Sequence, residues 1–151
     1  MSIRIKVPNV QLHFPNIFSK RGAFSGSIPA KYAGVFSFPK ESEQIKVLLD
    51  EVFSRVLSGK DSEGFEYFIK DGDYSRDTMF IGKWYMQASS LTAPVLIDTK
   101  GEVIINQIDL LYAEHYVDVV LDIWCTGDNY AKRVCATLVA VQLKENQEDL
   151  I

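Results

Sequence analysis

The stretch YVDVVLDIWCTGDNYAKRVCATLVAVQL, residues 116–143, decides the fold class. Its first half alternates strictly between an apolar and a polar row: Val117, Val119, Leu121 and Ile123, against Asp118 and Asp122. A period of two predicts a strand with one buried face. TGDN at 126–129 is a hairpin turn signal, after which 133–143 returns as a long apolar strand. The stretch therefore predicts an antiparallel β structure.

Similar alternation occurs near the N-terminus, where Ile3, Ile5 and Val7 alternate with basic residues, and it resumes to residue 14 after a break at Pro8. Two prolines and two glycines in residues 15–30 predict a long flexible loop. Other strands are predicted at 31–38, 84–88, 94–97 and 102–105, the last two joined by the turn DTKG at 98–101.

Residues 42–58 give the clearest helical pattern in the chain. One apolar stripe recurs at helical spacing: Ile45, Leu48, Leu49, Val52, Phe53 and Val56. Ser42 is expected to cap the start and Gly59 to end the helix. Six to eight strands with one amphipathic helix and long loops predict a mainly β domain, a small antiparallel barrel or sandwich. Neither an internal repeat nor a domain linker is visible.

Charge is distributed very unevenly along this chain of net charge −4. Residues 1–40 contain six basic and no acidic side chains, for +6. The remaining residues carry 10 basic and 20 acidic side chains, for −10, and the two parts sum to −4. Binding responds to local potential, so a basic face on an acidic body can still attract phosphates.

Aromatic residues occur beside basic ones in three segments, 14–40, 74–87 and 124–133. Single-stranded nucleic acid is held by basic grooves with rings on which bases stack, so these segments predict such a site. Some rings instead fill the core, and to the core we assign Phe14, Phe36, Phe38 and Phe53. The predicted nucleic-acid-binding residues are Lys20, Arg21, Phe24, Lys31, Tyr32, Tyr74, Arg76, Lys83, Trp84, Tyr85, Tyr130, Lys132 and Arg133. Strand alternation can turn Trp84 inward, in which case Tyr85 faces the groove.

Catalytic patterns are absent from the sequence. His13 and His115 are the only histidines, and each stands in a strand-like context typical of a structural role. Cys125 and Cys135 are expected to be thiols and supply too few ligands for a metal site. The cluster of aspartates in KDGDYSRD, 70–77, lacks the glutamate of a calcium loop, and a solvated loop is expected. We predict no enzyme activity, no metal and no cofactor.

The order of several short motifs is similar to that of one known family. The motifs are VQLHFPNIFSKRGAFSG (10–26), AKYAGVFSFPK (30–40), KDGD (70–73), GKWYMQASS (82–90), PVLIDTKGEVI (94–104) and the stretch from residue 116. Over residues 7–145 the chain resembles phage-encoded single-stranded-DNA-binding proteins with an OB fold. The resemblance implies a protein that coats single strands with little sequence preference during phage DNA replication and recombination.

Residue by residue, the family's YPN-F motif corresponds to FPNIF here, with Phe14 in place of the tyrosine. Lys31, Tyr32, Pro39 and Lys40 match the residues that bracket the second strand. Gly72 and Asp73 match the Gly-Asp pair before the central strand, and residues 82–90 match that strand.

The generic OB barrel places its helix after the third strand, whereas the pattern here places it after the second. Either Pro8 splits the first strand into two, or strands and loops have been added to the barrel.

We expect an OB-fold domain at 1–144 and a short acidic tail at 145–151. The tail is a candidate for recruiting replication or recombination proteins, and a homodimer is a further expectation. The location expected is the cytoplasm, that of the host cell for a phage protein. Two other classes fit the pattern: a β-barrel or sandwich structural protein of a phage particle, and a barrel that binds a small molecule.

Overall fold

The structure, a computed structural model, describes residues 2–21, 31–57, 64–92, 94–103, 116–126 and 132–144, and of residues 14–21 and 31 only the backbone. The strands are β1 (Ser2–Arg21), β2 (Lys31–Pro39), β3 (Glu66–Tyr67), β4 (Ile69–Asp71), β5 (Lys83–Ser90), β6 (Val95–Ile97), β7 (Tyr116–Cys125) and β8 (Arg133–Leu143). The helices are α1 (Glu43–Val56) and the 3₁₀ turns η1 (Gly72–Tyr74) and η2 (Thr78–Phe80).

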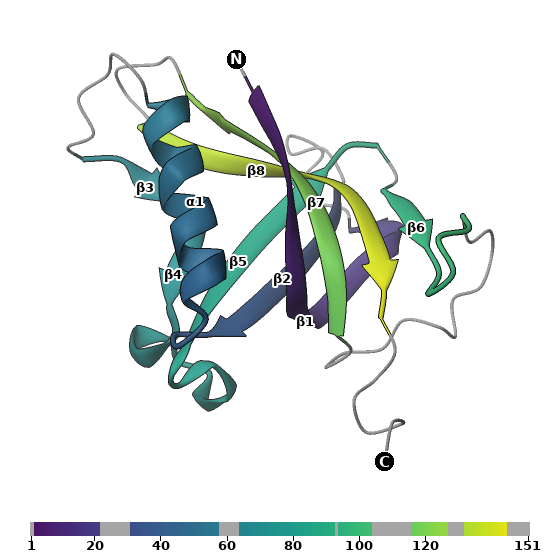
Figure 1. Ribbon diagram of the computed structural model, residues 1–151, viewed down its shortest axis with the longest axis horizontal. Coiled ribbons are helices and arrows are strands. Elements are labelled where there is room, and N and C mark those ends of the chain that lie inside the picture. Colours follow the sequence, from purple (N-terminus) through teal and green to yellow (C-terminus); the bar gives the residue numbers. More distant parts are fainter. Residues whose placement is uncertain are drawn as a thin grey trace.

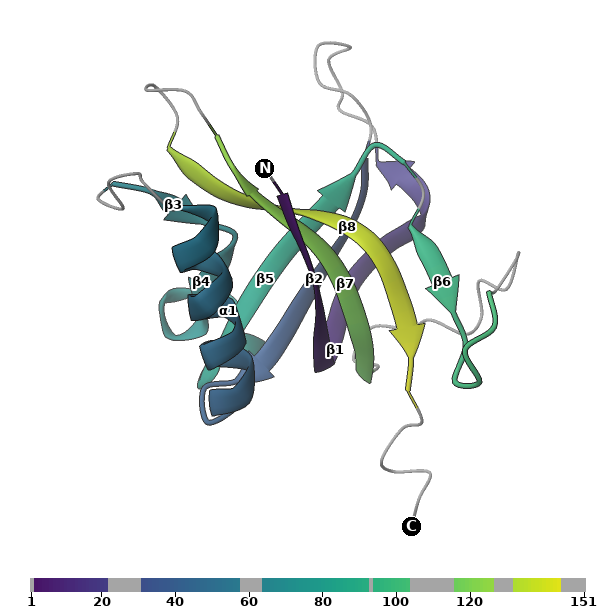
Figure 2. The same cartoon turned by 45° about the horizontal axis from the view of Figure 1, so that its top comes forward.

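Five strands close into a ring in the order β8-β7-β1-β2-β5 (Figures 1 and 2). Neighbours along this path are antiparallel, and the ring closes where Ser89 of β5 pairs in parallel with Thr137 of β8. Inward-facing residues fill one core, which includes the predicted Phe36, Phe38 and Phe53. The ring is therefore a barrel with OB-fold strand order rather than a sandwich.

Strand β1 resolves the alternatives left by the sequence. It continues through Pro8 with a register shift between Val7 and Val10, where Asn9 has a φ of 56° and donates its N–H to Asp118 Oδ1 at 2.9 Å. This local irregularity is a bulge, because β1 has two residues between these pairs where β7 has one. Pro8 therefore does not split the strand, and the extra strands β3, β4 and β6 lie outside the ring.

The loop predicted at 15–30 begins too early, because residues 15–21 belong to strand β1. This part of β1 pairs with β2 at Asn16–Ala33 and Arg21–Lys31. Register shifts on either side of Asn16 interrupt the alternation that would have revealed a strand. Beyond the ring, Asp98 N donates to Glu102 O at 2.8 Å in the predicted turn. The strand predicted after that turn is a single bridge, Ile97–Val103, within the described residues.

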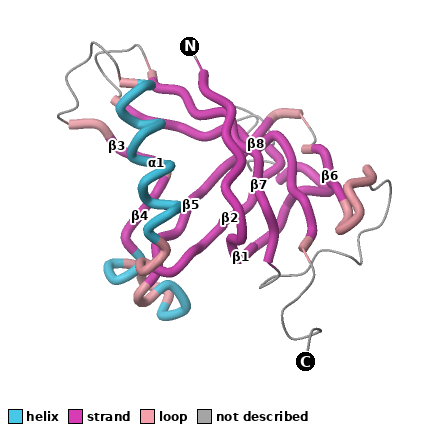
Figure 3. Tube along the Cα trace, viewed as in Figure 1, coloured by secondary structure: helices cyan, strands magenta, loops and turns pink. Residues whose placement is uncertain are grey.

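Helix α1 is amphipathic as predicted and closes one side of the ring (Figures 1 and 3). Its apolar stripe is buried except for the half-buried Leu48, and the Phe53 ring lies 4.9 Å from that of Tyr67 and 5.7 Å from that of Phe68. Ser42 occupies the N-cap position, but its side chain makes no capping hydrogen bond, so the predicted cap is wrong. The helix ends at Val56, before the segment that contains Gly59. No helix among the described residues could cross a membrane.

Candidate nucleic-acid interface

A short segment, residues 66–71, lies between β5 and β8 in the sheet. In that segment β3 pairs with β8 and β4 with β5, and Phe68 lies between these pairings. The N–H of Phe68 donates to Val134 O at 3.0 Å, and its carbonyl accepts from Gln87 N at 3.1 Å. The two ring strands therefore diverge from their junction at Ser89 and Thr137, and the segment forms a ledge between them.

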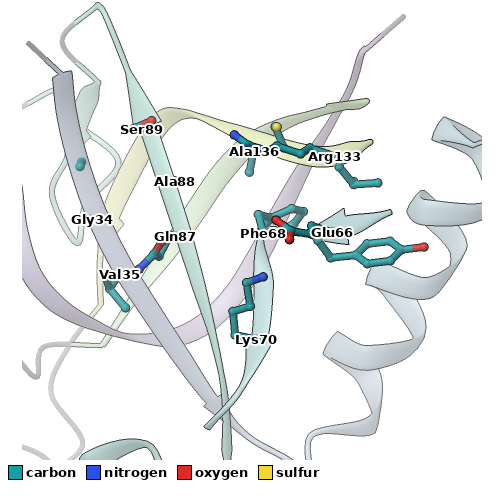
Figure 4. Close-up of a pocket in the computed structure, with 14 residues that line it drawn as sticks. Gly34, Val35, Glu66, Phe68, Lys70, Gln87, Ala88, Ser89, Arg133 and Ala136 are labelled. Carbon is teal, nitrogen blue, oxygen red and sulfur yellow. The ribbon is translucent and has the colours of Figure 1, made fainter. Parts of the chain in front are cut away.

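An open pocket of about 740 Å³ lies along this ledge (Figure 4). We call it the β5–β8 groove, and its lining is Ala33, Gly34, Val35, Glu66, Tyr67, Phe68, Lys70, Gln87, Ala88, Ser89, Arg133, Val134, Cys135 and Ala136. The lining carries two cationic side chains, Lys70 and Arg133, and one carboxylate, Glu66. Its small residues leave space over the strands, and its cations suit an anionic ligand.

Arg133 is the predicted residue that lies in the groove. Lys132, the preceding residue, is exposed, and its carbonyl accepts from the N–H of Glu66 at 2.9 Å. Lys83 and Tyr85 share the outward face of β5 with Gln87, because Met86 and Ala88 of that strand are buried. The structure thus brings four of the predicted residues to this side of the barrel.

Tyr85 lies at the end of that face and is covered on one side. Its ring stacks on Phe80 of η2, with centroids 4.6 Å apart and an angle of 17° between the planes. Phe80 also meets His13 edge-on at 5.1 Å, and His13 Nε2 is 2.7 Å from Ser37 Oγ. His13 is buried in this cluster, in the structural role predicted for it. Phe80 therefore occupies one ring face of Tyr85.

Trp84 and Tyr32 face away from the groove. Trp84 packs against the hydrophobic core, and the amino groups of Lys40 and Lys46 lie 5.0 and 5.1 Å from its ring centroid. Tyr32 lies on the same face of β2 as the buried Phe36, because residues four apart in a strand point to the same side. The alternation along each strand thus turns these two predicted residues to the inner side.

Tyr74 and Arg76 lie in the turn segment at the opposite end of β5 from the Ser89 junction. Both are exposed, and Tyr74 reaches 88% of its maximal exposure. Phe24 and Tyr130 lie outside the described residues. Lys20, Arg21 and Lys31 are described only by their backbone, at the ends of β1 and β2.

The basic excess of residues 1–40 is partly neutralised by distant acidic residues. Arg4 forms two hydrogen bonds of 2.8 and 3.0 Å to Asp122 and thereby lowers the pKa of that carboxyl. Lys6 Nζ lies 3.5 Å from Asp118 Oδ2, and Lys144 pairs with the same carboxylate at 3.3 Å. Lys40 also has acidic partners. Among the side chains that the structure describes, three of the six basic residues at 1–40 are therefore paired with carboxylates.

The partners of Lys40 are Asp71 and Asp73, each 2.6 Å from its Nζ. Hydrogen bonds from Lys40 lower the pKa of both carboxyls, and they in turn raise the pKa of Lys40. Asp73 Oδ1 also accepts from the N–H of Gly82 at 2.8 Å. The loop at 70–77 is solvated as predicted, since Asp73 and Asp77 are exposed, and Asp71 and Asp73 also form a clamp around one lysine. No group of three potential metal ligands occurs among the residues described.

Sequence reasoning missed Lys70 and Gln87, which line the groove, and it left Trp124 of the predicted segment 124–133 out of the site residues. Lys70 had no distinguishing pattern, since only the pairing of β4 with β5 brings it to the groove. Gln87 could have been found, because it shares the outward face of β5 with the predicted Tyr85. Trp124 is exposed on the outer side of β7, opposite Cys135.

Known proteins share this architecture over nearly its whole length. The single-stranded DNA-binding protein from bacteriophage Enc34, solved in complex with ssDNA, has a TM-score of 0.82 and 24% identity, covering 95% of this chain and 87% of that chain. Its C-terminal truncation has a TM-score of 0.83 and 25% identity, with coverages of 95% and 86%. Bacteriophage T7 gp2.5, a single-stranded DNA binding protein, shares the fold with a TM-score of 0.72 at 11% identity, covering 94% and 91%.

In sequence, protein p50 of Acyrthosiphon pisum secondary endosymbiont phage 1 is 29% identical over 153 residues, which cover 93% of this chain and 82% of p50. The family described as Enterobacter phage Enc34, ssDNA-binding protein, matches residues 3–150. Because this match spans nearly the whole chain and agrees with the barrel, the chain belongs to the Enc34 ssDNA-binding protein family.

Proposed function

We propose that this chain binds single-stranded DNA in the β5–β8 groove. The observation that carries the proposal is the place of the groove on the OB barrel. Counted along the chain, β2 and β5 are the second and third of the five ring strands, and both contribute residues to the groove. In OB folds the face of the second and third strands binds oligonucleotides. Membership in a family named for ssDNA binding, and a relative of the same fold solved with ssDNA, support the choice of ligand.

The charges of the groove suit a phosphate backbone. Lys70 points into it from β4 (Figure 4), Arg133 lines it from β8, and the exposed Lys132 precedes Arg133 along the chain. Such contacts release counterions, so the affinity falls as salt rises. The carboxylate of Glu66 can accept hydrogen bonds from base amino groups, whereas it repels phosphates.

Five other predicted residues lie in or beside two connections between strands of the ring. In an OB fold the loop between the first two strands and the loop between the last two contribute to oligonucleotide binding. Here these are the connections β1–β2 and β7–β8. The candidates on or beside the first are Lys20, Arg21, Phe24 and Lys31, and the candidate on the second is Tyr130.

Binding of this kind requires no catalytic group and little sequence preference, because every base offers a flat face for stacking. We propose a non-enzymatic protein that coats single strands during phage DNA replication and recombination in the cytoplasm of the host cell. Residues 1–144 would form the DNA-binding domain. The tail at 145–151, with three acidic residues, would recruit replication or recombination proteins, and a homodimer is a further association to test.

The two cysteines provide an internal footprint of the groove. Cys135 lines it, whereas Cys125 packs against the core with its Sγ 3.6 Å from Val56 O. Both are thiols. In C125S, which retains Cys135, oligo-dT should slow reaction with a maleimide. In C135S, which retains Cys125, the same oligonucleotide should leave the slower reaction unchanged.

Anisotropy of a fluorescein-labelled oligo-dT gives the affinity independently of the thiols. Steep weakening of binding by salt is expected, and a double-stranded oligonucleotide should bind less tightly. Absence of binding at low salt would overturn ssDNA binding and favour a structural protein of the phage particle. Binding without protection of Cys135 would place the strand outside the β5–β8 groove.

A further inference from the structure

Trp124 presents an indole ring beside the β5–β8 groove. It lies on the outward face of β7 and retains 37% of its maximal exposure. Its partner across the β7–β8 ladder is Cys135, which lines the groove. The indole Nε1–H donates to Thr137 Oγ1 at 3.0 Å, and Thr137 pairs with Ser89 at the junction of the ring. The ring is thus held at the border of the groove.

Electrostatics beside this ring suit an approaching phosphate backbone. Asp122 precedes Trp124 by two residues on the same face of β7, and an unpaired carboxylate there would repel a nucleic acid. The two hydrogen bonds from Arg4 offset that charge. Arg133, diagonal to Trp124 across the ladder, adds a positive charge on the groove side. The surroundings of the indole are therefore neutral to positive.

Two aromatic residues predicted for the site, Trp84 and Tyr85, are less available. Trp84, the other tryptophan of the chain, packs against the core beneath two lysines. Tyr85 has one ring face stacked on Phe80. Trp124 thus combines an exposed ring, a fixed orientation and a border with the groove.

We propose that Trp124 is a base-stacking residue, and that the DNA path continues from the β5–β8 groove across β8 onto β7. This inference rests on the proposed function and assigns one contact within it. A base that leaves the groove past Cys135 would stack on the indole. The hydrogen bond to Thr137 already restricts the ring, so binding loses little side-chain entropy. Alanine substitution of a stacking ring weakens binding by about 5-fold to 100-fold.

A matched pair of single-tryptophan proteins tests the assignment. W84F retains Trp124, and W124F retains Trp84, so tryptophan-selective excitation reports one ring in each. Titration with oligo-dT should quench W84F fluorescence and leave that of W124F nearly unchanged. By anisotropy of a labelled oligo-dT, W124A should bind about tenfold more weakly than the unsubstituted protein. T137V, which keeps the ring but removes its hydrogen bond, should show a smaller loss.

The outcomes separate this inference from the proposed function. If the unsubstituted protein binds oligo-dT while W124A binds equally well and the fluorescence of W84F is not quenched, Trp124 is not a stacking residue although the function stands. If the unsubstituted protein does not bind, the function itself is wrong. Thermal unfolding by circular dichroism checks that W124A folds. If it does not fold, the fluorescence of W84F compared with that of W124F decides.

Discussion

The amino group of Lys40 lies 2.6 Å from Oδ2 of Asp73, and this pair joins the end of β2 to the turn segment before β5. Asp71 holds the same amino group at 2.6 Å, and Lys40 N donates to Gly82 O at 3.1 Å. Since Phe80 of this segment stacks on Tyr85, the clamp also fixes one border of the outer face.

The clamp should make stability depend on pH. Lys40 lowers the pKa values of Asp71 and Asp73. The contribution of these two carboxylates to folding stability is therefore complete at a pH above the ordinary carboxyl pKa of 3.8, and it is lost as the pH falls through the lowered pKa values. D73N should therefore lower Tm near neutral pH, and the difference from the unsubstituted protein should shrink in acid. Thermal unfolding followed by circular dichroism across the acid range measures both.

D77N is the matched control, because it removes the same charge from an exposed position in the same segment. It should change Tm less than D73N does. Equal Tm values for D73N and the unsubstituted protein near neutral pH would show that the clamp adds nothing to stability.

Gly72 should tolerate no side chain. A Cβ added there would lie 1.9 Å from Phe80 O and 2.5 Å from Lys83 O, and both are backbone atoms that cannot rotate away. G72A should therefore lower the free energy of unfolding by about 3 kcal/mol, toward the upper end for overpacking. Urea denaturation measures this change.

Gly101 provides the comparison, since its φ is +87° but nothing lies within 4 Å of an added Cβ. G101A should cost only the backbone strain of a left-handed residue, about 1–2 kcal/mol. A G72A protein as stable as G101A would contradict the close approach seen at Gly72.

Lys70 and Arg133 should contribute to DNA affinity through charge. K70A and R133A should each weaken binding similarly for different sequences and reduce the salt slope by about 1, because each removes one phosphate contact. K100A removes the same charge from the exposed Asp98–Gly101 turn and should leave the slope unchanged. Equal slopes for K70A, R133A and K100A would show that only net charge matters.

The β1–β2 connection should form a second basic border. The double variant K20A/R21A should weaken binding across sequences and flatten the salt slope, because these residues precede the loop that borders the OB binding face. Anisotropy at several salt concentrations measures the slope. An unchanged slope would remove both residues from the site.

Local pattern predicted most of the barrel, because each long element carries its own periodicity. The apolar stripe of α1 and the alternation of β7 needed no knowledge of distant residues. Bulges limited the same reasoning in β1, where register shifts hide the strand beyond Phe14. Strands of two or three residues, such as β3 and β4, are too short to show any period.

The groove was harder to predict because distant pairings create it. Lys40 and Lys70 look alike in sequence, yet Lys40 is held by two carboxylates and Lys70 lines the groove. Likewise, Trp84 and Trp124 both stand in segments with strand-like patterns and basic residues. Which ring is covered depends on the core and on α1, which the strand pattern alone does not specify.

The long strand β1 also determines when the protein can fold. Its first half pairs with β7, and Arg4 meets a carboxylate 118 residues later. During synthesis, that half of β1 must therefore wait without its partner until nearly the whole domain has been translated. Contacts so distant in sequence slow folding, and an unpaired edge can meet other chains in the meantime. The paired lysine and arginine of that strand, exposed during this interval, would keep the nascent edge charged and discourage such encounters.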